Sequence, residues 1–211
     1  MITPKLIIIA GPNGAGKSTL SSDIVAKYGI TAFDFDKEYY QQWARFSYNP
    51  AVQRGCKEYV ADKFETSIVS AFETKSNFSF ETNYHTKDIL NYLDLADQYG
   101  YEKNLIFIGL KSATLAKERV ALRVSKNGHN VPNQEIDSRY KNGLTLLDNS
   151  FDRYNNIVIS ESYPDFKSEN CIGIQGEKGY LVKQPSYMKS LPRLTSHITG
   201  LEQSKSIRFS F

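Results

Sequence analysis

The chain has 211 residues and a mass of 24.0 kDa, with 40% hydrophobic and 23% charged residues and a net charge of +3. This size fits one globular domain with a substantial core. No apolar run reaches the length of a membrane span or a signal-peptide core, so we expect a cytoplasmic protein without membrane contact. Cys56 and Cys171 are isolated in the sequence, which disfavours metal or redox chemistry at either of them.

Strand and helix patterns alternate along the first 176 residues. Short β-branched or aromatic runs predict strands at 5–10, 30–35, 77–83, 103–110, 155–160 and 171–175. Apolar residues at helical spacing predict helices at about 17–28, 51–75, 86–99 and 112–126, and another that begins near 136. This alternation predicts an α/β fold, a mostly parallel sheet with helices on both faces.

A phosphate-binding motif follows the first expected strand. Residues 11–18, GPNGAGKS, match G-x-x-x-x-G-K-[ST] at every fixed position. The glycines let successive N–H groups point at one anion, and a helix N-terminus adds its positive dipole end. Lys17 can reach the β- and γ-phosphates, and the Ser18 hydroxyl can ligate Mg²⁺. The expected nucleotide-binding residues are Gly11, Pro12, Asn13, Gly14, Ala15, Gly16, Lys17, Ser18 and Thr19.

The alternative, a coincidental glycine-rich turn, is disfavoured by the strand before the motif and the helix after it. The sequence GPNGAGKST is also common in transporter-type ATPases. Those resemble a larger domain with an LSGGQ-like signature and an apolar strand that ends in Asp-Glu. Neither feature occurs in this chain. No SGG is present, and LIFIGL runs directly into Lys111 without an acidic residue. A transporter ATPase is therefore excluded.

Acidic residues follow two of the expected strands. Asp34 lies at the end of the run at 30–35, Asp36 lies just past it, and Glu81 lies near the end of the run at 77–83. Ligands of open parallel sheets bind at the carboxyl ends of the strands, and phosphoryl transfer needs a carboxylate that accepts the acceptor's proton. Asp36 is the candidate base, with Asp34 in support; the alternative is that both are loop acids or helix N-caps. Glu81 is expected near Mg²⁺ or at the acceptor hydroxyl, with Thr82 and Asn83 adding hydrogen bonds.

Basic residues recur on one helical face within 116–132. Arg119 and Arg123 lie four residues apart, Lys126 continues the face, and His129 follows in a glycine-containing loop. Guanidinium groups suit a transferring phosphoryl group, and a helix that closes over it would exclude water. The alternative is a solvated basic face. We therefore expect a lid at about 112–135 in which Arg119 and Arg123 are catalytic together with Lys17 and Asp36.

The basic residues of the last part of the chain are not balanced by acids. Residues 178–211 carry six lysines and arginines against Glu202 alone, a net charge of +5. We expect a domain over 1–176 and a basic C-terminal extension over 177–211. Such an extension is compatible with contact to nucleic acid or an acidic partner, or with a solvated tail.

At this point the residues resemble the zeta-toxin-like P-loop kinases. The resemblance rests on GPNGAGKST at 11–19, Asp34 and Asp36, FSFETN at 78–83, and ERVALRVSKNGHNVPNQEIDSRY at 118–140. It implies a P-loop NTPase three-layer sandwich with a helical lid that phosphorylates a sugar-nucleotide hydroxyl with ATP or GTP and Mg²⁺. In the better-known toxins the acceptor is UDP-N-acetylglucosamine.

The resemblance also implies roles for individual residues. Asp36 would be the base, Glu81 and Glu65 would bind the acceptor, and Arg119 and Arg123 would serve the phosphates. His129 falls where the toxins use a second arginine. Asn83 departs from the usual threonine, and N-G-H departs from G-G-H, which bears on the identity of the acceptor. An antitoxin protein is a candidate partner, although toxicity does not follow from the resemblance.

Three functions therefore remain open at the level of sequence. The first is a small-molecule kinase that takes a nucleoside triphosphate and a hydroxyl acceptor. The second keeps the fold but phosphorylates a nucleic-acid end, with the basic extension as anchor. The third is a non-catalytic, nucleotide-dependent interaction module. The placement of the acids and arginines favours the first.

Overall fold

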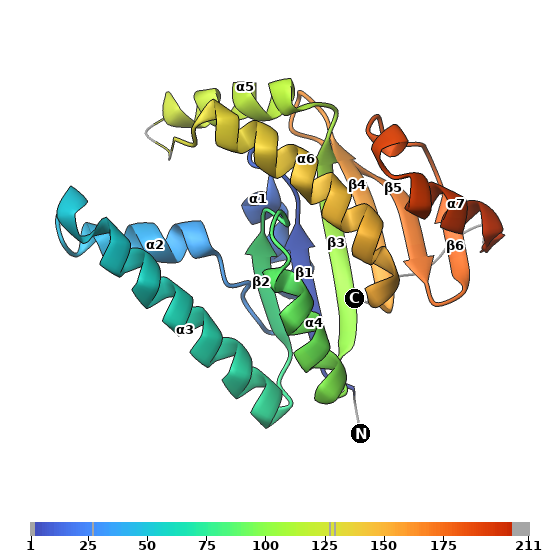
Figure 1. Cartoon of the computed structure of the whole chain (residues 1–211), viewed down its shortest axis with the longest axis horizontal. Coiled ribbons are helices and arrows are strands. Elements are labelled where there is room, and N and C mark those ends of the chain that lie inside the picture. Colours follow the sequence, from blue (N-terminus) through green and yellow to red (C-terminus); the bar gives the residue numbers. More distant parts are fainter. Residues whose placement is uncertain (1–2, 27, 127, 129, 204–211) are drawn as a thin grey trace.

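The computed structural model describes residues 3–26, 28–126, 128 and 130–203. Its centre is a seven-stranded sheet in the order β2-β1-β3-β4-β5-β6-β7 (Figure 1). The strands are β1 Lys5–Ala10, β2 Phe78–Thr82, β3 Glu102–Leu110, β4 Asn156–Ser162, β5 Ser168–Gln175, β6 Lys178–Leu181 and β7 Glu202–Gln203. The first four are parallel, whereas β5 is antiparallel to β4 and to β6. The expected mostly parallel sheet is confirmed.

Helices cover both faces of this sheet. The α-helices are α1 Lys17–Ala26, α2 Phe35–Ala44, α3 Gln53–Thr74, α4 Asp88–Gln98, α5 Ala113–Val124, α6 Asn133–Ser150 and α7 Pro192–Gly200. One core cluster joins α3, α4, α6 and α7 to the sheet, and a second joins α1 and α5 to the other face. Within the described ranges, no helix is long and apolar enough to cross a membrane.

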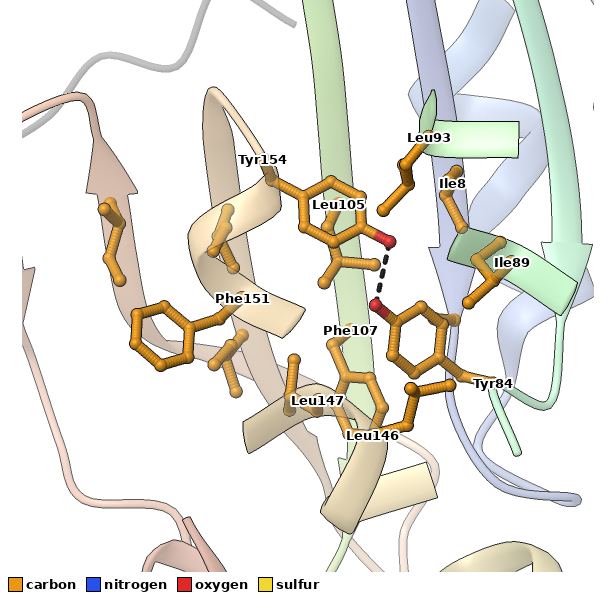
Figure 2. Packing of buried hydrophobic residues seen from close by; sticks show 14 of the residues in the cluster. Ile8, Tyr84, Ile89, Leu93, Leu105, Phe107, Leu146, Leu147, Phe151 and Tyr154 are labelled. Carbon is orange, nitrogen blue, oxygen red and sulfur yellow. Dashed lines mark hydrogen bonds between the residues drawn. The ribbon is translucent and has the colours of Figure 1, made fainter. Parts of the chain in front are cut away.

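The larger core contains a buried pair of tyrosines. The hydroxyls of Tyr84 and Tyr154 lie 2.8 Å apart among Leu93, Leu105 and Phe107 (Figure 2). Burial raises the pKa of Tyr84 to about 12, so its hydroxyl stays protonated and available for hydrogen bonding. The pair satisfies polar atoms inside an apolar cluster, as a buried polar group requires.

The segment at 30–35 is not the strand that its sequence predicts. Only Phe33 forms a β-bridge, to Phe80 of β2, and α2 begins at Phe35. The Asp34 carboxylate caps this helix by accepting a 3.1 Å hydrogen bond from the backbone N–H of Lys37. The capping aspartate therefore turns the chain into a helix after a single bridge. Asp34 is therefore a helix N-cap, one of the positions that the sequence left open for it.

The expected basic extension continues the sheet and the core as far as Gln203. β6 pairs with β5, and β7 pairs with β6. Leu191, Leu194 and Ile198 are buried in the larger core cluster. Arg193 donates to the main-chain carbonyl of Asp148 at 3.0 Å, so at least this cation serves the fold.

Candidate functional site

The phosphate-binding motif forms the turn between β1 and α1. Gly11, Gly14 and Gly16 have φ angles of +148°, +78° and +91°, which only glycine adopts without strain. A Cβ at Gly11 would overlap the carbonyl oxygen of Ile108 in the neighbouring strand, and one at Gly14 would lie 3.0 Å from Cβ of Arg119. The expected strand, loop and helix are confirmed.

A cavity of about 650 Å³ opens above this loop. Its walls come from the loop, the C-terminal end of β2, the start of α2, the C-terminal half of α5 and the turn after β4. It is lined by Asn13, Gly14, Gly16, Lys17, Ser18, Thr19, Asp34, Phe35, Asp36, Glu81, Thr82, Asn83, His85, Thr86, Arg119, Leu122, Arg123, Lys126, Gly128 and Phe166. Most of the residues that the sequence singled out therefore face one space.

The ammonium group of Lys17 is held by protein oxygens at the floor of the cavity. Nζ donates to the carbonyl of Gly11 at 2.9 Å and to Oδ1 of Asn83 at 3.0 Å. Burial lowers the pKa of Lys17, while the charges of Glu81 and Asp36 act in the opposite direction. Asn83 thus belongs to the site through Lys17.

Ser18 lies between two carboxylates. Its hydroxyl is 2.7 Å from Oε2 of Glu81 and 3.0 Å from Oδ2 of Asp34, although it has only one proton to donate. Oε1 of Glu81 accepts a 2.6 Å hydrogen bond from Ser21. Burial raises the pKa of Glu81, and the hydrogen bonds from Ser21 and Ser18 offset part of this.

These oxygens fit a magnesium ion. A hydroxyl with adjacent carboxylates is a hard-oxygen donor set, and Mg²⁺ in kinases takes few protein ligands because phosphates and waters supply the rest. The described part of the chain contains no cluster of three or more His, Cys, Asp or Glu side chains that could hold a metal ion.

Asp36 lies in the first turn of α2, two residues after the cap. It is exposed and lines the cavity together with Lys17 and Asn83. Although residues 30–35 do not form a strand, Asp36 still lies at the edge of the sheet, because the bridge of Phe33 keeps this segment beside β2.

The two arginines of α5 differ in their surroundings. Arg119 is 5% exposed, and its Nη1 donates at 2.9 Å both to the carbonyl of Gly14 and to Oγ of Ser162. Nη2 donates to the carbonyl of Tyr163. Arg123 is only partly buried and lines the cavity. The guanidinium of Arg119 is therefore held by hydrogen bonds to other residues of the chain. Arg119 and Arg123 lie on the same face of α5, as expected.

Glu65, expected at the acceptor, is not brought into this arrangement. Glu65 is exposed on α3, accepts a 3.1 Å hydrogen bond from the hydroxyl of Tyr92, and does not line the cavity. His129 lies outside the described residues. Next to it, Gly128 packs so closely on Arg123 that a Cβ would overlap that side chain.

Some residues of the site were not identified from the sequence: His85 and Phe166, which line the cavity, and Ser21, which binds Glu81. His85 follows Asn83 by two positions, and burial lowers its pKa, with the positive charge of Arg139 adding to the effect. Ser21, one helical turn after Ser18, could have been found from the helical period. Phe166, by contrast, carries no local signal, because only the pairing of β4 with β5 brings it to the cavity.

One protein-family model matches more than half of the chain. The model of the zeta toxin family matches residues 2–162. A search of curated proteins gives no significant match.

Three solved structures share the fold. The PezAT toxin–antitoxin system of Streptococcus pneumoniae is 17% identical over 80% of this chain and 71% of that chain, with a TM-score of 0.60. A candidate kinase from Chloroflexus aurantiacus is 18% identical over 66% of this chain and 78% of that chain, with a TM-score of 0.55. The AvrRxo1-ORF1:ORF2 complex with ATP is 15% identical over 98% of this chain and 66% of that chain, with a TM-score of 0.66. At these identities, the three structures establish the fold alone.

Proposed function

Because the chain belongs to the zeta toxin family of P-loop kinases, we propose that it transfers the γ-phosphoryl group of ATP or GTP to a hydroxyl group of a small molecule. The acceptor that we propose is a sugar nucleotide such as UDP-N-acetylglucosamine. One observation carries the proposal: Lys17, Ser18 and Asp36 face a single cavity together with Glu81 and Arg123. Each of these side chains has a task in phosphoryl transfer.

The phosphates of the nucleotide would bind along the loop. Backbone N–H groups between Gly14 and Ser18 would receive the β-phosphate, and Lys17 would exchange its carbonyl partners for the β- and γ-phosphate oxygens. Such an exchange requires little movement, because Nζ already lies over the loop. Arg123 would add positive charge at the transferring group.

Ser18 would hold Mg²⁺, with Glu81 and Asp34 in the surrounding shell. When bound, the ion neutralises charge on the β- and γ-phosphates. The hydrogen bond from Ser21 keeps the Glu81 carboxylate directed at Ser18.

Asp36 would accept the proton of the acceptor hydroxyl. The acceptor oxygen then forms a bond to the γ-phosphorus, the bond between this phosphorus and the β–γ bridging oxygen breaks, and the nucleoside diphosphate leaves. The exposed position of Asp36 at the start of α2 leaves room for an acceptor beside it.

The experiment is a direct assay of phosphotransfer. Purified protein, Mg²⁺ and ATP are incubated with a panel of sugar nucleotides led by UDP-N-acetylglucosamine, and mass spectrometry detects an added phosphate. Lys17→Ala and Asp36→Asn should abolish the product. Asp23→Asn, at an exposed position of α1 outside the cavity, is the matched control and should keep it.

Other acceptors are further arms of the same assay. A product formed only on an oligonucleotide with a 5′-hydroxyl would replace the sugar nucleotide with a nucleic-acid end. Bound ATP without any product would contradict the kinase proposal. An antitoxin-like partner is proposed by analogy with the toxin–antitoxin system of Streptococcus pneumoniae, and inhibition of the wild-type reaction by a candidate protein would test it.

A further inference from the structure

An aromatic side chain is held out of the core at the edge of the cavity. Phe166 lies in the turn between β4 and β5, is 60% exposed and lines the cavity. Its φ of +66° belongs to the left-handed region, which a bulky side chain adopts only with backbone strain. A ring that is mostly exposed adds little to the packing of the core, and a strained backbone does not stabilise the fold. The position of this ring therefore requires another explanation.

Hydrogen bonds fix the turn that carries this ring. The N–H of Phe166 donates to the carbonyl of Tyr163 at 2.9 Å, and the N–H of Tyr163 donates to the carbonyl of Lys167 at 2.8 Å. The N–H of Lys167 also donates to the Asp165 carboxylate at 3.2 Å. The left-handed residue is thus set by the turn, and the ring is presented on a defined backbone.

Arg119 connects the ring to the phosphate loop. Its guanidinium carbon lies 4.6 Å from the centroid of the Phe166 ring, a cation–π contact. The same guanidinium donates to the carbonyls of Gly14 and Tyr163. The ring is therefore held at a fixed position relative to the loop, and its exposed surface is open to a further planar group.

The place of the ring within the cavity identifies that group. Asp36 and Asn83 line the part of the cavity formed by α2 and β2, where the acceptor is proposed to bind. Phe166 and Leu122, which is 43% exposed, lie on the other elements, the β4–β5 turn and α5. A nucleotide whose phosphates lie on the loop needs an apolar surface for its base, and these side chains provide one within the same cavity.

We infer that Phe166 is the stacking surface for the base of the nucleoside triphosphate, with Leu122 adding apolar contact and Arg119 acting as the positioning residue of the ring. This inference rests on the proposed function, because the phosphates must occupy the loop. Stacking reads the face of a base and not its edge. The site therefore binds ATP and GTP alike and prefers both to CTP, because a purine covers more of the ring.

The test separates the base from the phosphates. Isothermal titration calorimetry in Mg²⁺ measures ATP, GTP, CTP and inorganic tripolyphosphate binding to wild type, Phe166→Ala and Phe166→Tyr. Phe166→Ala should weaken ATP and GTP binding about 10-fold, within the range that stacking of one base provides, and leave tripolyphosphate binding within about 2-fold. Phe166→Tyr, which keeps an aromatic ring, should bind ATP and GTP as tightly as wild type does.

Tyr48→Ala is the matched control. Tyr48 is also an exposed aromatic residue with a positive φ, 55% exposed at +58°, but it lies between α2 and α3 and does not line the cavity. ATP binding to this variant should equal that of wild type.

Two outcomes overturn the inference: unchanged ATP binding by Phe166→Ala, or a parallel loss of ATP and tripolyphosphate, which would make the ring a support of the loop. Wild-type protein that binds neither ligand would instead overturn the proposed function.

Discussion

The hydroxyl of Ser21 donates a 2.6 Å hydrogen bond to Oε1 of Glu81, and both residues are buried. The other oxygen of this carboxylate meets Ser18 at 2.7 Å. Glu81 is therefore fixed at both oxygens by two residues one helical turn apart on α1. Its orientation depends on a serine outside the phosphate-binding motif.

Ser21→Ala should impair phosphotransfer although the motif stays intact. The hydrogen bond from Ser21 lowers the pKa of Glu81, so its loss moves this pKa further up. Since the carboxylate form is the one that supports Mg²⁺, the acidic limb of the pH–rate profile should shift to higher pH, and the Mg²⁺ concentration for half-maximal rate should rise. Ser22→Ala, at an exposed neighbouring position, should leave both unchanged. An unaltered pH–rate profile in Ser21→Ala would show that Ser21 does not support the carboxylate form of Glu81.

Glu81→Gln should change how the stability of the protein depends on pH. Burial raises the pKa of Glu81 in the folded protein above its unfolded value, so the folded state favours the protonated form. The contribution of Glu81 to stability is therefore present at pH below the unfolded pKa and is lost as pH rises through the folded pKa. Relative to Glu81→Gln, wild type should lose stability between acidic and neutral pH. Thermal denaturation of both proteins at pH 5 and pH 7.5 measures this, and a difference that grows in the opposite direction would refute it.

The phosphate loop should tolerate no side chain at its first glycine. Gly11→Ala places a Cβ against the carbonyl of Ile108 at a φ of +148°, and the combined strain and overlap should cost about 3 kcal/mol of unfolding free energy. Gly176→Ala is the control, because Gly176 has a φ of +55° with nothing within 4 Å of the added atom. It should cost only about 1 kcal/mol. Urea denaturation monitored by the single tryptophan measures both; equal costs would mean that the overlap is relieved by backbone movement.

Arg119 and Arg123 should respond differently to the same substitution. Arg119→Met removes hydrogen bonds to Gly14, Ser162 and Tyr163 from a buried position and should lower the free energy of unfolding by about 2 to 4 kcal/mol. Arg123→Met should cost less stability and act mainly on turnover, because this residue is partly buried and faces the cavity. Denaturation curves and initial rates of the two variants are the measurement. If Arg119→Met were as stable as wild type and merely inactive, the arginine would belong to the catalytic group expected from the sequence.

The sequence predicted the parts of the site that depend on neighbouring residues in the chain. The phosphate loop, its flanking strand and helix, and the shared face of Arg119 and Arg123 all follow from local spacing. The error at 30–35 arose because a short aromatic run can begin a strand or precede a helix. The capping bond of Asp34 decides between the two, and residue order alone does not reveal it.

The parts that could not be predicted depend on contacts between distant segments. The helical period places Arg119 on the cavity side of α5, but only the approach of Gly14 and Tyr163 determines that it is enclosed. The last helix was missed because its buried residues are only Leu194 and Ile198, too few to give a clear period. Phe166 reaches the cavity through the register of an antiparallel strand pair that lies far from the motif in sequence.

The attachment of α2 has a consequence for the evolution and engineering of this enzyme. α2 has no buried residue and is anchored by Phe35 against Phe64 of α3 and by the 2.5 Å ion pair of Glu38 with Lys63. The proposed base therefore belongs to a helical hairpin, α2–α3, beside the sheet, whereas the loop that holds the phosphates is built into the sheet (Figure 1). A hairpin attached in this way can be exchanged as a unit. Its exchange between relatives would move the proposed base as one unit and leave the phosphate loop unchanged.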